Sequence, residues 1–127
     1  MKKCKLVITT IVDGQEHSIA REGEMDLSLL SPTLIYREEN GTTRICLKGE
    51  TAEIERIGDY TMRLNLVREQ FTEGEIGIGG SSGAIQSYAH RIQYSVSERS
   101  LLLLLHYDLI ISGETQKMQI RLAASYL

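Results

Sequence analysis

Apolar residues are densest between Leu101 and Gly113, and the pattern there predicts a β-strand rather than a membrane-spanning helix. A spanning helix needs about 20 consecutive apolar residues, whereas His106 and Asp108 interrupt this run well short of that length. The following segment, Met118 to Ala124, alternates apolar and polar residues, which is typical of a strand with one buried face. Together the two segments predict an antiparallel hairpin.

A two-residue loop at Gly113-Glu114 would join these strands and fix which side chains face each other. In that register Leu105 lies opposite Leu122, and Tyr107 lies opposite Ile120, so that all four point to the same face. The register is self-consistent, because the positions that it turns to this face are apolar or aromatic.

Shorter alternating segments elsewhere predict further strands separated by tight turns. The strongest turn signal is Asn40-Gly41, and the others are Asp13-Gly14, Gly49-Glu50 and a three-residue loop centred on Gly58. These loop lengths keep the apolar face of each strand opposite the apolar face of the next. The predicted strands are Lys3–Val12, a second strand through Ile19, Thr33–Glu38, Thr42–Lys48, strands around Ile54 and Leu64, and Ala84–Val96.

Two segments fit neither a regular strand nor a simple turn. From Glu22 to Ser31 the alternation of Met25, Leu27 and Leu29 favours a strand, and a short helical turn is the alternative. The segment from Glu73 to Gly83 is rich in glycine and predicts a flexible connection or a kinked strand. No long helix is predicted.

Antiparallel strands that each have one apolar face and follow one another through short hairpins favour a closed meander over a sandwich, which needs longer crossovers. We therefore predict an all-β fold in which residues 1–127 form one domain, a single antiparallel up-and-down β-barrel of about eight strands. The predicted interior residues are Leu6, Ile8, Leu34, Tyr36, Ile45, Leu47, Met62, Leu64, Leu105, Tyr107, Leu109, Ile120 and Leu122.

Charge and cysteine content restrict the classes of function. A net charge of −3 and a pI near 5.6 argue against a nucleic-acid partner, whose phosphates would favour a basic surface. Cys4 and Cys46 have no metal-ligand spacing and do not resemble a disulfide framework, which favours free thiols in a reducing cytosol. The apolar run from Leu6 is short and ends without a cleavage site, so we expect a strand there rather than a signal peptide. A cytoplasmic protein that does not associate with a membrane is therefore expected.

Several short motifs occur in an informative order along the chain: Tyr36-Arg37-Glu38, Thr42-Thr43-Arg44-Ile45, Ile54-Glu55-Arg56-Ile57-Gly58, Gly83 at the start of a strand, and Tyr107-Asp108-Leu109. With these motifs the chain resembles the YwiB-like bacterial family of domains of unknown function over nearly its whole length. The resemblance implies a small calycin-like, lipocalin-like β-barrel. It brings no established activity and no catalytic residues.

The sequence predicts no catalytic or metal site. Gly79 to Gly83 matches the G-x-S-x-G pattern of a nucleophile elbow, but no helix is predicted after it, so a glycine-rich turn is favoured. His17, His90 and His106 lack companion ligands at metal-binding spacing. The carboxylates of Glu38-Glu39 are interpreted as solvated charge beside a turn. We expect no enzyme, no cofactor and no metal.

Arg68 is the clearest signal for ligand binding. The alternation around Leu64 continues to Arg68, and an arginine that faces a low-dielectric interior needs an anionic partner. Tyr36 and Tyr107 would add hydroxyl groups to the same interior. We therefore predict a non-enzymatic binding protein whose small amphipathic or apolar ligand contacts these three side chains. Small inward residues would leave room for that ligand at Ala52, Ala84 and Ala124. For the arginine taken by itself, an ion pair at the rim with Glu38, Glu69 or Glu73 is favoured over an anion-binding role.

The outward face of the most apolar strand is unusually hydrophobic for a wall in contact with water, because Leu102, Leu104 and Ile110 lie on it. Contiguous exposed apolar patches tend to mark interfaces. Residues 22–32 could cover this patch within the same chain, or a second subunit could. The sequence leaves both open, and we favour a homodimer through Leu102, Leu104 and Ile110. A barrel with a filled interior that acts as such an interaction module is the alternative function.

Overall fold

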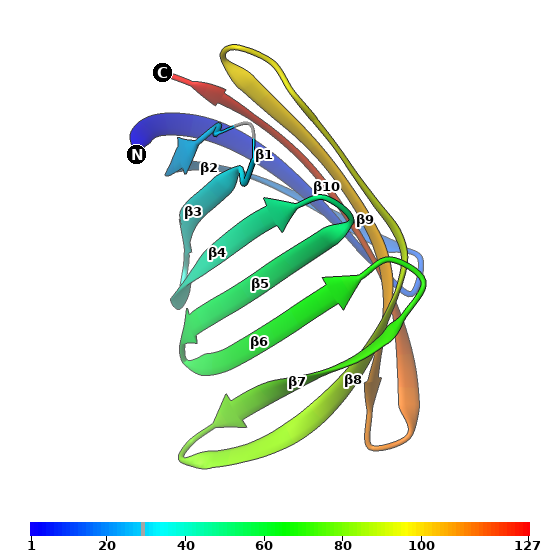
Figure 1. Ribbon diagram of the computed structural model, residues 1–127. Helices are drawn as coiled ribbons and strands as arrows, with labels where there is room; N and C mark the ends of the chain where they lie inside the picture. The colour runs from blue at the N-terminus through cyan, green and yellow to red at the C-terminus, as the bar shows by residue number, and fades with distance from the viewer. Residues whose placement is uncertain (29) are drawn as a thin grey trace.

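The computed structural model describes residues 1–28 and 30–127, and these form a closed antiparallel β-barrel of ten strands (Figure 1). The strands are β1 (Lys2–Val12), β2 (Gln15–Asp26), β3 (Thr33–Glu38), β4 (Gly41–Lys48), β5 (Thr51–Gly58), β6 (Tyr60–Val67), β7 (Phe71–Ile78), β8 (Ser81–Val96), β9 (Ser100–Ile111) and β10 (Glu114–Tyr126).

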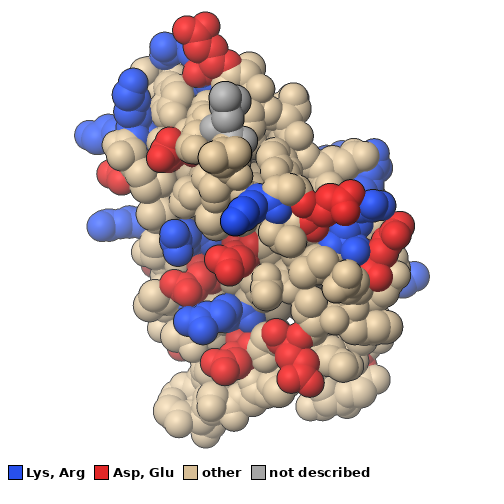
Figure 2. Space-filling model, viewed as in Figure 1, with Lys and Arg blue, Asp and Glu red and all other residues tan. Residues whose placement is uncertain are grey.

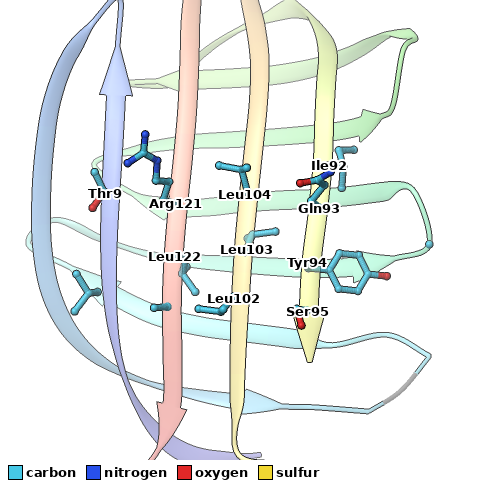
Figure 3. A pocket seen from close by; sticks show the side chains of 13 residues that line it. Thr9, Ile92, Gln93, Tyr94, Ser95, Leu102, Leu103, Leu104, Arg121 and Leu122 are labelled. Atoms are coloured by element: carbon cyan, nitrogen blue, oxygen red, sulfur yellow. The ribbon is translucent and has the colours of Figure 1, made fainter. Parts of the chain in front are cut away.

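Every strand pairs with its neighbours along the chain, and β1 closes the barrel by pairing with both β2 and β10. The up-and-down barrel predicted from the sequence is therefore confirmed, with ten strands rather than about eight. Strands β3 to β6 cross behind β1, β8, β9 and β10, so that inward side chains from the two halves meet in the core (Figure 3). The two ends of the chain lie close together, and the Leu127 amide donates to the Lys3 carbonyl.

Between Glu73 and Gly83 the sequence predicted either a flexible connection or a kinked strand, and the structure has strand there: β7 runs to Ile78, and β8 begins at Ser81 after the turn at Gly79-Gly80. The glycines of β7 occupy crowded strand positions, and a Cβ atom at Gly74 would lie 2.2 Å from the Arg63 carbonyl oxygen. A side chain is excluded there by the close approach of the neighbouring backbone. Glycine thus permits this strand, although the sequence pattern makes it look like a loop.

The segment from Glu22 to Ser31 begins as a strand, since β2 continues to Asp26 and buries Met25 completely. Leu27 packs against the core, and its backbone amide donates to the Tyr126 hydroxyl over 3.2 Å. The helical turn considered as an alternative does not form at residues 22–28 or 30–31. Leu29, which was part of the predicted alternation, lies outside the described residues.

Two predicted hairpin loops are displaced by one residue. The β9–β10 loop is Ser112-Gly113, where both residues have positive φ (52° and 79°), as in a type I′ turn. Leu105 therefore pairs with Ile120, and not with Leu122. The β3–β4 loop is likewise Glu39-Asn40.

The β5–β6 loop is also displaced by one residue, being centred on Asp59 and not on Gly58. The predicted loops at Asp13-Gly14 and Gly49-Glu50 are correct. A one-residue displacement of a loop moves the pairing by two positions, so each predicted inward face remains inward.

The core is one contiguous cluster that contains eleven of the thirteen predicted interior residues as buried side chains. The other two, Met62 and Ile120, are half-buried and pack against it. Ala84 was expected inside and is exposed, because the register of β8 turns Ile85 inward instead. The residues described here contain no helix that is long and apolar enough to cross a bilayer.

Candidate functional site

An open hollow of about 850 Å³ lies on the outer wall, where β1, β10, β9 and β8 run side by side (Figure 3). We call this hollow the outer groove. The lining side chains that alternate outward are Val7, Thr9, Gln93, Ser95, Leu102, Leu104, Arg121 and Ala123.

Cross-strand pairing brings four apolar side chains and Ser95 into one line on this wall. Val7 pairs with Ala20 on one side and with Ala123 on the other, Ala123 pairs with Leu102, and Leu102 pairs with Ser95. We call these five residues the apolar row, although Ser95 is polar and Ala20 lies just beyond the lining of the outer groove. Val7 is 49% exposed and Leu102 is 58% exposed, so the row presents apolar surface to solvent from β2 to β9.

The row next to it is more polar. Arg121 pairs with Thr9 in β1 and with Leu104 in β9, and Leu104 pairs with Gln93 in β8. Leu104 is less exposed than Leu102. Hydrogen-bonding groups thus lie along one edge of the groove. Ile110, the third predicted interface residue, is also turned outward, but it pairs with Thr115 away from the groove and does not line it.

The described residues of segment 22–32 do not cover the outer groove. Leu27 packs against the core, Pro32 is buried, and Leu30 is 83% exposed. Within the part of the chain that the structure describes, the apolar row therefore stays open to solvent.

A group of basic side chains adjoins the groove. The β8–β9 register shifts between Ala89 and Arg91, and this irregularity leaves both His90 and Arg91 exposed. His90 Nε2 lies 2.9 Å from Asp108 Oδ2, while Arg91 pairs with His106. His106 and Asp108 are both turned outward, and Asp108 contacts His90.

The pKa of His106 is lowered, first by its partial burial and then by the charges of Arg91, Arg121 and His90. No carboxylate among the described residues lies within 4 Å of either arginine guanidinium. The charges that act on His106 are therefore positive, and Asp108 is the acidic side chain beside them.

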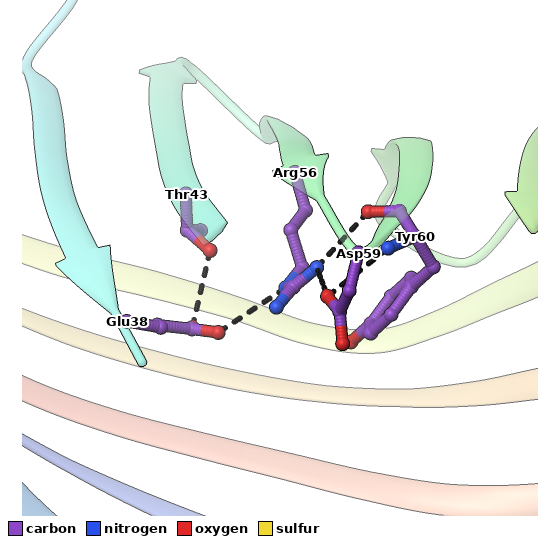
Figure 4. A network of polar contacts seen from close by, with 5 residues as sticks. All are labelled: Glu38, Thr43, Arg56, Asp59 and Tyr60. Atoms are coloured by element: carbon purple, nitrogen blue, oxygen red, sulfur yellow. Dashed lines mark hydrogen bonds and ion pairs between the residues drawn. The ribbon is translucent and has the colours of Figure 1, made fainter. Parts of the chain in front are cut away.

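A second polar assembly, which we call the rim network, lies where β3 to β6 turn (Figure 4). Arg56 is its centre: Nε lies 3.2 Å from Glu38 Oε2, and Nη1 lies 2.7 Å from Asp59 Oδ1. Arg56 Nη1 also donates to the Tyr60 carbonyl over 2.9 Å, and the guanidinium stacks 3.9 Å from the Tyr60 ring centroid. Thr43 Oγ1 donates to the other oxygen of Glu38 over 3.1 Å.

Arg56 is only 6% exposed, so its charge needs these partners. The guanidinium in turn holds the pKa of Asp59 below its ordinary value, mainly through their hydrogen bond. With two carboxylates around one arginine, the rim network is internally satisfied. This arrangement is suited to holding the strand ends together, and it does not leave the cation free for a ligand.

Tyr36 and Tyr107 both lie inside the barrel, at 6% and 3% exposure. Burial raises the pKa of the Tyr36 hydroxyl, and the charge of Glu38 adds to this effect. Burial also raises the pKa of Tyr107, with a smaller contribution from Tyr36. The two predicted tyrosines are thus brought near each other in the core, next to the rim network.

Arg68, the third predicted ligand contact, is not inward. Its side chain is 40% exposed and pairs with Glu50 over 2.8 Å and with Glu69 over 3.3 Å. The expectation is wrong because β6 ends at Val67 and Glu69 has a positive φ of 60°, so alternation stops before Arg68. Arg68 lies at the opposite end of the β5–β6 hairpin from Arg56, beside the β4–β5 turn.

Sequence reasoning missed Arg56 as the buried cation. The available signal was the alternation Ala52, Ile54, Arg56, which turns the arginine to the inward face of β5. The interpretation of Glu38 as solvated charge is also wrong, because its carboxylate is 31% exposed and bound to Arg56. The pairing of the two side chains does not follow from local sequence, since Glu38 lies eighteen positions from Arg56.

The remaining motifs form structural elements. Gly79-Gly80 is a two-residue turn with positive φ at both positions, and strand β8 follows it where a nucleophile elbow would need a helix. Among residues 1–28 and 30–127, no group of three His, Cys, Asp or Glu side chains is placed to hold a metal ion. On the face seen in Figure 2, acidic and basic side chains are interspersed.

Comparison with known proteins supports the fold and supplies no activity. The chain is similar to the ywiB protein of Bacillus subtilis, whose crystal structure matches with a TM-score of 0.85 at 15% identity, over 99% of this chain and 92% of that one. No curated protein matches significantly. The family model described as "Domain of unknown function (DUF1934)" matches residues 2–122. This chain therefore belongs to the DUF1934 family, a family of unknown function.

Proposed function

We propose that this protein is a non-enzymatic binding protein that takes a small amphipathic ligand in its outer groove. The observation that carries the proposal is the apolar row, in which the exposed side chains of Val7 and Leu102 flank Ala123 beside a hollow of about 850 Å³. That volume is in the range of small-molecule sites, which are mostly apolar with a few polar groups. Arg121 and Gln93 supply such polar groups at the edge.

The interior supports a ligand site less well. Leu64, Leu66 and Leu105 are fully buried on different sides of the barrel and belong to one packed cluster. A barrel of this kind can be filled by its own side chains. The side chains predicted to contact an internal ligand do not converge either, because Arg68 is turned to the surface.

The strength of binding can be bounded from the area of contact. About 300 Å² of combined apolar surface removed from water would contribute about 7 kcal/mol. Association costs at least about 4 kcal/mol in lost translational and rotational freedom. The difference corresponds to a dissociation constant in the millimolar range for the apolar contact alone. A soluble probe and a method suited to weak binding are therefore needed.

Titration with 1-octanol, followed by amide chemical shifts in nuclear magnetic resonance, tests the proposal. We expect saturable shifts centred on Val7, Leu102 and Ala123, and loss of saturation in Leu102→Glu. Ile57→Glu is the matched control, since Ile57 is 61% exposed on another strand. The proposal fails if the wild type shows no saturable shifts, or if Leu102→Glu and Ile57→Glu bind equally well.

A homodimer through the same surface is the second candidate, and the small side chains of the apolar row favour it. Ala20, Ala123 and Ser95 would let two walls approach closely around Leu102. Sedimentation equilibrium at micromolar concentration would then give a dimer that Leu102→Glu converts to a folded monomer, with Ile57→Glu still dimeric. A monomeric wild type excludes this candidate and leaves the ligand proposal in place.

A further inference from the structure

We propose that the ligand of the outer groove is an amphipathic carboxylate, whose head is received by Arg91, His106 and Arg121 and whose hydrocarbon tail lies along the apolar row. This inference rests on the proposed function and adds the charge of the ligand to it.

The irregularity in β8 brings the basic residues together. In a regular strand His90 and Arg91 would point to opposite faces, whereas the register shift between Ala89 and Arg91 leaves both exposed. Beyond the shift, Arg91 is paired with His106, and Gln93 is paired with Leu104. The bulge thus adds a second cationic side chain to the wall directly above the groove.

Arg121 connects this basic group to the groove. It lines the hollow itself, and it pairs with Leu104, which is two residues from His106 on the same face of β9. The apolar row lies two residues further along each strand, a distance of about 7 Å. A single molecule can therefore contact the basic group with its head and Leu102 with its tail; Figure 3 shows Arg121 and Leu102 on this wall.

The charges around His106 favour an anion. It is faced from β8 by His90 and Arg91, from β10 by Arg121 and the neutral Gln119, and along its own strand by Asp108. Asp108 is the acidic residue of this group, and its Oδ2 atom lies 2.9 Å from His90 Nε2.

The three arginines in ion pairs lie elsewhere, at Arg56, Arg63 and Arg68, whereas Arg91 and Arg121 have no carboxylate within 4 Å among the described residues. Partial burial is the main cause of the lowered pKa of His106, and the positive charges of Arg91 and Arg121 add to it; a bound carboxylate would neutralise those charges.

The shape of the site favours a tail rather than a free inorganic anion. The apolar part of the row crosses four strands spaced about 4.8 Å apart, so it extends about 14 Å from Ala20 to Leu102. An inorganic anion would leave this surface exposed, and a neutral hydrocarbon would leave the arginines without a partner. A carboxylate with a linear alkyl chain would cover the apolar row and also pair with the arginines.

Octanoate and 1-octanol form the matched pair of probes, because they share a chain length and differ in the charge of the head. We expect octanoate to bind the wild type about two- to thirty-fold more tightly than 1-octanol at low salt, as two exposed ion pairs would give. The Arg91→Gln/Arg121→Gln variant should lose this preference and still bind 1-octanol. The control Arg37→Gln/Arg44→Gln removes the same charge from exposed positions on β3 and β4, and this variant should keep the preference for octanoate.

The imidazole resonances of His106 give an independent readout. Bound octanoate should raise its pKa in the wild type, since a nearby anion favours the charged form, and should leave it unchanged in Arg91→Gln/Arg121→Gln. If neither probe binds saturably, the proposed function itself fails. If both bind equally, or if the double variant keeps the preference, only the assignment of a carboxylate is overturned. Binding to anionic vesicles without saturable binding of octanoate would overturn it in favour of a membrane surface.

Discussion

Truncation of Leu105 to alanine tests whether the inward face of β9 has been assigned correctly. Leu105 has no exposed surface, and its cross-strand partners Ile92 and Ile120 belong to or pack against the same core. Its neighbours on either side along the strand, Leu104 and His106, are only partly buried. The substitution therefore removes a side chain from the centre of the barrel and leaves the outer wall unchanged.

The expected cost follows from the lost contacts and from the cavity that remains. Removing the equivalent of three methylene groups costs about 2.4 kcal/mol in transfer free energy. A residual cavity of about 80 Å³ adds about 2 kcal/mol, which places the total near 4 kcal/mol. With an unfolding entropy of about 2.1 cal/mol/K per residue, the 127-residue chain should lose about 15 °C in melting temperature.

Urea denaturation followed by circular dichroism measures this cost, and Leu102→Ala is the matched control on the opposite face of the same strand. Leu102 is 58% exposed, so its truncation should change the free energy of unfolding by less than about 0.5 kcal/mol. The denaturant slope should be the same in both variants. If Leu102→Ala proved as costly as Leu105→Ala, the two faces of β9 would be assigned the wrong way round.

Three further predictions concern the rim network and the core. Gly41→Ala should lower the melting temperature of the barrel, because its Cβ would lie 2.8 Å from the guanidinium carbon of the buried Arg56. Gly83→Ala is the control, since the space around Gly83 is open, and it should leave the melting temperature unchanged. Asp59, whose pKa is lowered, contributes stability above its ordinary pKa and loses it as the pH falls through the lowered value, so Asp59→Asn should flatten the acid limb of stability against pH. Tyr36 and Tyr107, whose pKa values are raised, contribute stability that is lost as the pH rises above the ordinary tyrosine pKa, and ultraviolet titration should show their phenolates appearing only on unfolding.

The inward faces of the strands could be predicted from the sequence even where the loops could not. The β9–β10 loop lies one residue earlier than predicted, yet Leu105 and Leu122 share a face as expected. A loop displacement of one residue preserves the faces because side chains alternate with a period of two. The alternating pattern therefore identifies which side chains face the core. It identifies which residues pair across two strands only to within two positions.

The polar sites were much less predictable, because they depend on where strands end and on contacts between distant segments. Arg68 was expected inside by continuing an alternation that stops at Val67, and the positive φ of Glu69 has no signature in the pattern. Arg56 has the inward alternation, but its partner Glu38 comes from another hairpin. The bulge at His90, which adjoins the basic group, is similarly set by pairing with β9.

Closure of the barrel by β1 and β10 has a consequence for how the chain reaches this structure. The pairs from Cys4 with Tyr126 to Val12 with Met118 join segments more than a hundred positions apart, so the entropy of closing a long loop must be lost before they form. During synthesis on the ribosome, β1 can pair with β2 but must wait for almost the whole chain before its other edge is covered. An open edge that carries Leu6 and Ile8 is prone to pair with other chains in that interval. Closure of the barrel covers this edge and so removes the place where another chain could pair with β1.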